Sequence, residues 1–344
     1  MKLFDDDSLA SAALARGVPA FLLVNPMEYH GPHLSLRNDH LVSVGIARDL
    51  HAYLRAHTAD LHDDAFPFLM TRDLDVGVEP TSGPGSVHVP FAKVRTEVIR
   101  ACRELRRLGA RKVVLVTFHG SPLHAFALEA GVEWLTRHGI VAFSPMNLLL
   151  RELMFADGAR YAEAYEGIPA NDRATMLADV ASDFHGGFFE TSLALHYAQS
   201  SVRAFYTDVP DCPPFPEPKL VTRVLGLLER IGFRDVAREI SLVVRGASWM
   251  ALRPFPGYTG APRYASVEAG AVFAKLLLGL YGPAAEDVLS GGASSPTPPL
   301  GWVRYLTLYG RLGVPTPPSA MMTFPGLGQA EAPPAEGHAH ATPA

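Results

Sequence analysis

The chain has 344 residues, 48% of them hydrophobic, and a formal net charge of −5. That length supports one large core, or one core with a small appendage. The mildly acidic charge gives no electrostatic reason to bind nucleic acid or an anionic membrane, so neither is expected as a partner.

The amino-terminal segment and the cysteine content favour a cytoplasmic protein. Asp5, Asp6 and Asp7 stand where a signal peptide needs an apolar stretch. No uncharged apolar run approaches the ~20 residues of a membrane-spanning helix. With only two cysteines, Cys102 and Cys212, a disulfide framework is excluded as the basis of stability.

The first half of the chain alternates apolar runs with longer segments of helical periodicity. Strands are predicted over residues 19–25, 111–117 and 139–145. Helices are predicted over residues 40–57, 91–108 and 123–138, with a Gly- and Pro-rich loop over residues 71–90. This alternation is typical of βαβ units. The expected fold class is therefore α/β, with a largely parallel sheet sandwiched between helices in an α/β/α arrangement.

The second half is less regular. Residues 151–180 are polar with little pattern, which predicts a flap or insertion. One or two helices are predicted over residues 219–250, and a final amphipathic helix over residues 266–280. We expect a main domain over residues 1–285 and a Pro- and Gly-rich extension over residues 286–344, with its last ~20 residues disordered.

Potential metal ligands follow the predicted strands. Glu28 and His30 come after the first strand and are two residues apart, so in an extended segment both side chains point to one face. Asp39 stands at the front of the next predicted helix, and His119 follows the second strand. Ligands bind at the carboxyl ends of parallel strands. Taken singly, each residue also has a structural explanation, such as capping a helix or satisfying a loop carbonyl.

The segment Glu28-x-His30-Gly31-Pro32-His33-Leu34-x-Leu36-x-x-Asp39 resembles the signature E-Q-H-G-P-H-L-P-L-G-T-D of the creatininase (creatinine amidohydrolase) family. Four further regions resemble its other motifs in the right order: Pro84-Gly85-Ser86, Thr117-Phe118-His119-Gly120, His185 to Ser192, and Gly257 to Gly260 with Ala265 to Gly270. The resemblance extends over about residues 18–280.

The resemblance implies a two-metal hydrolase, usually a homo-oligomer and often a hexamer, that uses zinc, manganese or iron. Glu28 and His119 would bind one metal and His30 the other, with Asp39 as the bridge. Creatininase has a glutamate two residues after its strand-end histidine, where this chain has Ser121. Glu190 is therefore the candidate ligand for the second metal, and His185 the candidate general base or substrate-binding residue.

Several residues beside the expected ligands depart from the family pattern and are candidates for substrate binding. With the serine of the Pro-Gly-Ser loop, they are Tyr29, Arg37, Ser86, Phe118, Ser121 and Phe188. If Arg37 points inward it can bind an anionic substrate group; if it points outward it is an ordinary solvated arginine. Ala181 replaces a tryptophan that creatininase uses, and the three tryptophans present are assigned no role in the site. Creatinine is therefore expected to be a poor substrate.

The expected function is a dinuclear-metal amidohydrolase that cleaves a C–N amide bond, a cyclic amide included, in a small polar molecule. One alternative keeps the metals and changes the reaction to that of a formamide deformylase, a keto-inositol C–C hydrolase or a peptidase. Another is a non-catalytic scaffold whose site has decayed. Metal content separates the catalytic functions from the scaffold.

Overall fold

The computed structural model describes residues 2–57, 66–155, 157–215, 217–312 and 320–324. Its centre is a parallel sheet in the order β2-β1-β3-β4. The strands are β1 (Ala20–Leu23), β2 (Leu69–Met70), β3 (Lys112–Val116) and β4 (Val141–Phe143). Ala20 pairs with Val113 across β1 and β3, and Lys112 pairs with Val141 across β3 and β4. The predicted parallel α/β sheet is confirmed, and β2 is a short edge strand that the sequence did not predict.

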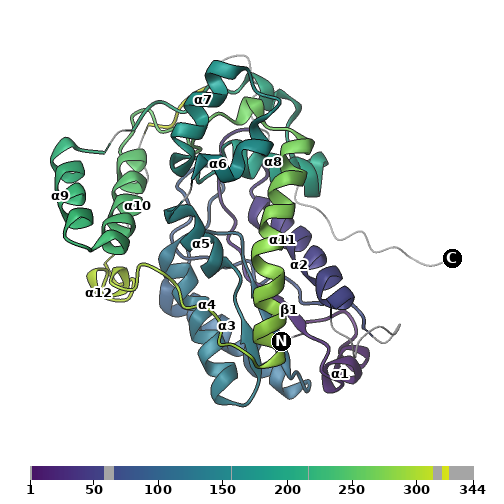
Figure 1. Cartoon of the computed structure of the whole chain (residues 1–344). Helices are drawn as coiled ribbons and strands as arrows, with labels where there is room; N and C mark the ends of the chain where they lie inside the picture. Colours follow the sequence, from purple (N-terminus) through teal and green to yellow (C-terminus); the bar gives the residue numbers. More distant parts are fainter. Residues whose placement is uncertain (1, 58–65, 156, 216, 313–319, 325–344) are drawn as a thin grey trace.

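Helices cover both faces of this sheet (Figure 1). The bounds in the first half are α1 (Asp7–Ala15), α2 (Asn38–His57), α3 (Phe91–Arg107), α4 (Pro122–Arg137) and α5 (Met146–Met154). Those in the second half are α6 (Gly158–Tyr161), α7 (Ala170–Ala178), α8 (Phe188–Ala198), α9 (Lys219–Arg230), α10 (Arg234–Met250), α11 (Val267–Ser290) and α12 (Val303–Leu306). Short 3-10 helices are η2 (Ala162–Tyr165), η3 (Val180–Ser182), η4 (Gln199–Ser201), η5 (Ala204–Asp208) and η6 (Pro262–Tyr264).

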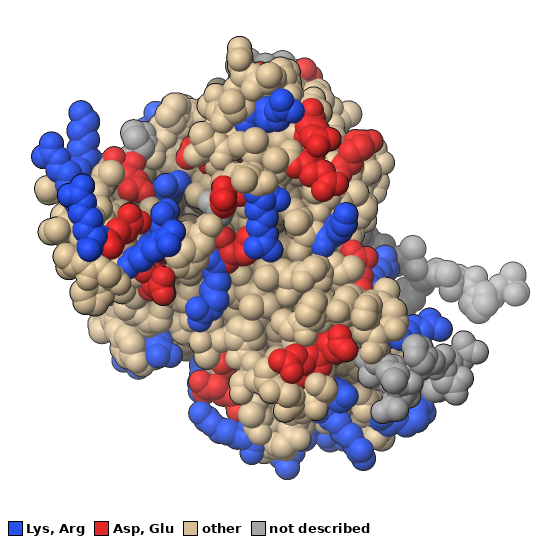
Figure 2. All heavy atoms as spheres, viewed as in Figure 1, with Lys and Arg blue, Asp and Glu red and all other residues tan. Residues whose placement is uncertain are grey.

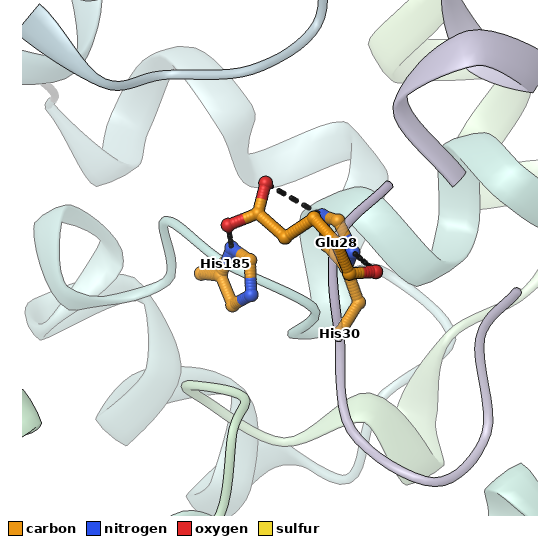
Figure 3. Close-up of side chains that lie close together, drawn as sticks. All are labelled: Glu28, His30 and His185. Atoms are coloured by element: carbon orange, nitrogen blue, oxygen red, sulfur yellow. Dashed lines mark hydrogen bonds and ion pairs between the residues drawn. The ribbon is translucent and has the colours of Figure 1, made fainter. Parts of the chain in front are cut away.

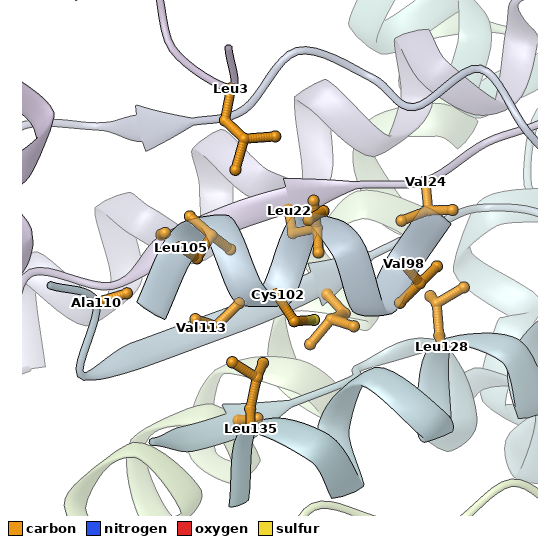
Figure 4. Close-up of a cluster of buried hydrophobic side chains, with 14 of the residues drawn as sticks. Leu3, Leu22, Val24, Val98, Cys102, Leu105, Ala110, Val113, Leu128 and Leu135 are labelled. Carbon is orange, nitrogen blue, oxygen red and sulfur yellow. The ribbon is translucent and has the colours of Figure 1, made fainter. Parts of the chain in front are cut away.

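Alternation along the strands divides the interior into two hydrophobic clusters. In β3, Val113 and Leu115 face a cluster that includes residues of α3 and α4. Val114 and Val116 face the opposite cluster, which includes residues of α2, α8 and α11. Successive strand side chains point to opposite faces, so one buried strand supplies both clusters. Figure 4 shows part of the first cluster, with α3 lying across the sheet.

Residues 151–180, predicted as a flap or insertion, are mostly helical. They complete α5 and form α6, η2, α7 and the start of η3. The helices are short, and Asp157 caps one of them by accepting from Ala159 N. Tyr161 and Tyr165 bury their rings in the second cluster. Elements of four residues show too little periodicity to be detected in the sequence.

The last long helix, α11, extends ten residues beyond its predicted end and closes at Gly291, whose φ of 85° suits a left-handed cap. The proposed domain boundary at residue 285 therefore lies inside this helix. By length and composition, α11 is apolar enough to cross a membrane, yet here it packs against α8 and α2.

Part of the carboxy-terminal extension packs on the body. Ser144 N donates to Ser295 Oγ at 3.1 Å, and Asn147 Nδ2 donates to Pro296 O at 2.7 Å. The α9–α10 hairpin stands out from the body, with α12 beside it (Figure 1). The last 20 residues, predicted to be disordered, lie outside the described part of the chain.

Candidate metal centre

Six potential ligands meet beyond the carboxyl ends of β1 and β3. Glu28 and His30 lie on the loop after β1, Asp39 in the first turn of α2, and His119 on the loop after β3. His185 and Glu190 come from the loop before α8 and from its first turn. All six side chains are buried. The fold therefore gathers three carboxylates and three imidazoles where ligands bind in parallel α/β sheets.

Asp39 lies between the two nearest histidines. His30 Nε2 is 3.0 Å from Asp39 Oδ1, and His119 Nδ1 is 3.8 Å from Asp39 Oδ2. Glu28 Oε2 lies 2.7 Å from His119 Nδ1 and 4.0 Å from His30 Nε2. Each oxygen of Asp39 thus faces a different imidazole, which is the arrangement that a carboxylate bridging two cations requires.

Two further residues complete this cluster from the side of α8. Glu190 Oε2 is 3.5 Å from His30 Nε2 and accepts a hydrogen bond from Gly186 N at 2.7 Å. His185 Nδ1 is 3.9 Å from Glu28 Oε1, and the His185 ring stacks on His30 with centroids 4.2 Å apart. Figure 3 shows Glu28 between the two imidazoles.

Backbone carbonyls fix the tautomer of all three histidines. His30 Nδ1 lies 3.1 Å from Glu28 O, His119 Nε2 lies 2.7 Å from Val78 O, and His185 Nε2 lies 2.9 Å from Tyr29 O. A carbonyl oxygen only accepts, so each of these nitrogens carries the proton. When a ring carries no second proton, its other nitrogen directs a lone pair at the cluster. Metal-ligating histidines are oriented in this way.

The carboxylates leave oxygens without donors. Among the described residues, Glu28 Oε2 and both oxygens of Asp39 are buried, and their only possible donors are the neighbouring imidazoles when these carry a second proton. The second oxygen of Glu28 accepts from Thr81 N. Buried unpaired carboxylate oxygens cost free energy unless a cation compensates them. The donor set, mixed nitrogen and oxygen, fits zinc or manganese.

The pKa values reflect this demand for positive charge. Burial opposes charge on His30 and His119, but the neighbouring carboxylates raise their pKa to about 10 and about 9. Burial, strengthened by other carboxylates, raises the pKa of Glu190 to about 8. Burial and the charge of His30 lower the pKa of His185 to about 3. Protons held on His30 and His119 therefore supply the charge that a divalent cation would bring.

Two overlapping groups could each hold an ion: Glu28 with Asp39 and His119, and Glu28 with His30 and His185. In both groups the potential ligand atoms lie within 4.8 Å of one another. His185, which the sequence placed as a base or a substrate-binding residue, thus also lies at a ligand position. The geometry fits a metal centre built from the expected residues.

Arg37, Ser86 and Ser121 have other partners. Arg37 Nη2 contacts both carboxylate oxygens of Asp75, at 2.8 and 2.9 Å, and the pair is about half exposed. Ser86 Oγ accepts from Tyr29 N and donates to Thr81 O. Ser121 caps α4 by accepting from His124 N. Arg37 therefore takes the outward orientation, and both serines shape the loops that carry the ligands.

The aromatic residues expected beside the substrate lie mostly in the interior. Phe118 and Phe188 are both buried in the second hydrophobic cluster. The Phe188 ring lies 4.6 Å from Tyr165. Tyr29 is half-buried, and its ring lies close to the backbone of Gly83 and Gly257, where a Cβ would clash with it.

Trp249 is a site residue that the sequence did not reveal. It lies in the last turn of α10, is 4% exposed, and lies 5.2 Å from the His185 ring between centroids. His33 belongs to the first motif, and its Nε2 lies 3.1 Å from Gly186 O and 2.9 Å from Thr191 Oγ1, which joins that motif to the loop before α8. Trp249 has no local sequence signal, because its contact joins segments far apart in the chain.

Known proteins share this fold. A search of curated protein sequences found no match. Among solved structures, the chain is similar to a manganese creatininase at 19% identity, with a TM-score of 0.54, covering 83% of this chain and 98% of that one. A mutant creatininase of the Zn-Zn type matches at 20% identity and a TM-score of 0.53, covering 81% and 93% of the two chains. A mutant creatininase complexed with creatine matches at 19% identity and a TM-score of 0.53, covering 81% and 95%.

The sequence also matches the family model of creatininase, described as creatinine amidohydrolase, over residues 8–279. This match includes all six potential ligands and most of the chain. The chain is therefore a member of the creatininase family.

Proposed function

We propose that this protein is a dinuclear-metal amidohydrolase that opens a C–N amide bond, linear or cyclic, in a small polar molecule. The observation that carries the proposal is the orientation of the three imidazoles of His30, His119 and His185. In each ring one nitrogen donates to a backbone carbonyl, and the other nitrogen faces a buried carboxylate. Similar structures include zinc and manganese forms of creatininase.

The residues divide by position around Asp39. Glu28 and His119 would hold one ion and His30 and Glu190 the other, with Asp39 between them. Two divalent ions bound there would polarise a substrate carbonyl and activate a water molecule for attack.

His185 would move the proton. Its Nε2–H is committed to Tyr29 O, so Nδ1 is the atom that can accept a proton. Burial and the charge of His30 lower the pKa of His185 and keep its imidazole neutral, so Nδ1 has a free lone pair. Attack on the amide carbon would deliver a proton to His185 Nδ1, and the same atom would return it to the leaving nitrogen.

Metal analysis combined with a screen of amides tests the proposal. Purified protein should contain about two divalent ions per chain and hydrolyse at least one amide in a metal-dependent way. The screen includes creatinine, formamides and short peptides, so the alternative reactions are measured side by side. Creatinine turned over at the rate of a dedicated creatininase would contradict the expected change of substrate. Protein with well under one metal per chain would support the scaffold.

We further propose that the protein is a homo-oligomer and that α9 contributes to its interface. Leu220, Val224, Leu227 and Ile231 are each at least half exposed, and their 4-3-4 spacing is that of a coiled-coil seam. With Phe233 and Val236 they present on the order of 600 Å² of apolar surface, near the ~800 Å² that each partner gives to a standard interface.

A second copy is the occupant that fits this face. The sequence offers no complementary apolar segment of its own, because residues 58–65, 313–319 and 325–344 contain few large apolar side chains. On the view of Figure 2, basic side chains lie over the hairpin, beside acidic ones, and no continuous surface of one charge is visible. A hexamer, a cytoplasmic location and the absence of nucleic-acid and membrane partners remain predictions.

A further inference from the structure

The carboxy-terminal extension returns to the active-site wall after the family match ends at residue 279. Phe255 N donates to Ala320 O at 2.9 Å, and Met322 N donates to Phe255 O at 2.8 Å. Phe255 and Met321 form an isolated parallel bridge. The Phe324 ring lies 6.2 Å from the Tyr258 ring. Residues 320–324 thus bind both ends of the loop over residues 255–258.

The extension also binds α10, at a second point. Glu239 accepts hydrogen bonds from Leu300 N at 2.9 Å and from Trp302 Nε1 at 2.7 Å. This contact matters because α10 buries few side chains against the body: of its residues, only Ala237 and Trp249 are buried. A helix with so few buried side chains needs further contacts to hold a fixed position.

The loop over residues 255–258 in turn holds Trp249. The Phe255 ring lies 4.9 Å from the Trp249 ring, and Trp249 Nε1 donates to Tyr258 O at 2.9 Å. One residue further along, Thr259 N donates to the carbonyl of His185 at 2.7 Å. The same short segment therefore fixes both the indole and the backbone of His185.

The imidazole of His185 is in contact with two other rings. His30 stacks on it at 4.2 Å with 22° between the planes, and Trp249 lies 5.2 Å away, tilted by 51°. The hydrogen bond from Nε2 to Tyr29 O restricts rotation of the imidazole about its own axis. The contact with the indole further restricts movement of the imidazole.

We infer that residues 320–324 form a clasp that holds the loop 255–258, and that Trp249 is thereby a positioning residue for His185. The inference rests on the proposed function, because it gives His185 a place in a working metal centre. In this assignment the extension is part of the active-site scaffold.

The clasp is tested in the full-length chain by removing one N–H. Met322→Pro deletes the donor to Phe255 O, whereas Thr323→Pro deletes an N–H for which the described residues supply no acceptor. Deuterium exchange of residues 250–260 should become about five- to tenfold faster in Met322→Pro, the effect of losing one backbone hydrogen bond. Thr323→Pro should exchange like the wild type.

The positioning role is tested with Co²⁺ as a spectroscopic probe. Met322→Pro and Trp249→Ala should shift the visible Co²⁺ bands in the same direction, and Trp249→Phe should largely restore the wild-type spectrum. Faster exchange with an unchanged spectrum would show a purely structural extension and overturn the inference. Unchanged exchange would overturn the clasp itself. Wild-type protein that binds no Co²⁺ would refute the proposed function and, with it, the role of Trp249. If the wild type binds Co²⁺ and the variants show the same spectrum as the wild type, only the inference about the clasp and Trp249 is refuted.

Discussion

Replacing Asp39 by asparagine should remove the metal and, with it, the extra thermal stability that bound metal gives the protein. The substitution keeps the size of the side chain but removes the charge that faces His30 at 3.0 Å and His119 at 3.8 Å. A bridging carboxylate serves two ions, so the variant should lose most of both. Metal analysis after dialysis should fall from about two ions per chain to well under one.

The thermal consequence can be estimated from ligand linkage. A ligand at about 1,000 times its dissociation constant stabilises the folded state by ~4 kcal/mol, which corresponds to a Tm increase on the order of 10 °C for a chain of this size. Wild-type protein should lose that increase in EDTA, whereas Asp39→Asn should show almost no response. In EDTA the variant should be less stable than the wild type, because it removes the carboxylate that faces the protonated His30 and His119.

Differential scanning fluorimetry with and without EDTA measures both effects. Asp49→Asn is a matched control on the same helix, since Asp49 accepts from Tyr197 OH rather than facing the cluster. The control should keep its metal and its EDTA response. An Asp39→Asn protein with a full metal complement would refute the bridging role.

Four further predictions follow from individual side chains. Glu190→Gln should keep the fold and lose about one of two ions, since Glu190 lies 3.5 Å from His30 Nε2; full occupancy by metal analysis would remove it from the ligand set. Arg37→Ala should change the free energy of unfolding by ~1 kcal/mol or less and leave KM unchanged, because its ion pair is half exposed; a large rise in KM would restore the anion-binding hypothesis. Burial, with the charge of a neighbouring glutamate, raises the pKa of Glu129 to about 7, so the charged form of Glu129 destabilises the fold increasingly as the pH rises from about 4 to 7. Glu129→Gln should therefore raise the free energy of unfolding, measured in urea, by ~1 kcal/mol at pH 8 and leave it unchanged at pH 4. An equal gain at both pH values would contradict this. Leu227→Glu should lower the oligomer mass in light scattering, while Leu9→Glu, at an exposed position on α1, should not; a monomeric wild type, or an unchanged mass, would exclude α9 as the interface.

The positions of Glu28, His30 and His119 could be predicted from periodicity alone. A buried strand pattern ends just before each of them, and parallel strands bring their carboxyl ends to one edge. Asp39 follows because it begins the next helix. These are local features, so the sequence contains their signals close to the residues themselves.

The approach of Glu190 to His30 has no such signal. More than 150 residues separate the two, and only the family resemblance placed them together. Trp249 was not predicted at the site at all, because it reaches His185 from α10, an element that follows His185 by about 50 residues and contacts the extension. Long-range contacts between irregular segments cannot be read from a single sequence.

The aromatic residues were placed near the substrate because they adjoin ligands in the sequence. In an extended segment, neighbouring side chains point to opposite faces, so Phe118 turns into the core when His119 turns to the cluster. On a helix, positions two apart do not share a face, which separates Phe188 from Glu190. The two placements misjudged side-chain direction rather than the backbone.

The anchoring of the three histidines to backbone carbonyls bears on how the protein is prepared. Because backbone carbonyls, rather than an ion, orient the rings, binding of an ion needs no reorientation of these histidines. A preformed site of mixed nitrogen and oxygen donors discriminates weakly among neighbouring divalent metals, whose affinities follow a common order. The ion found in a given preparation will therefore follow the growth medium and purification buffers, and activities measured on different batches can be compared only after their metal content is matched.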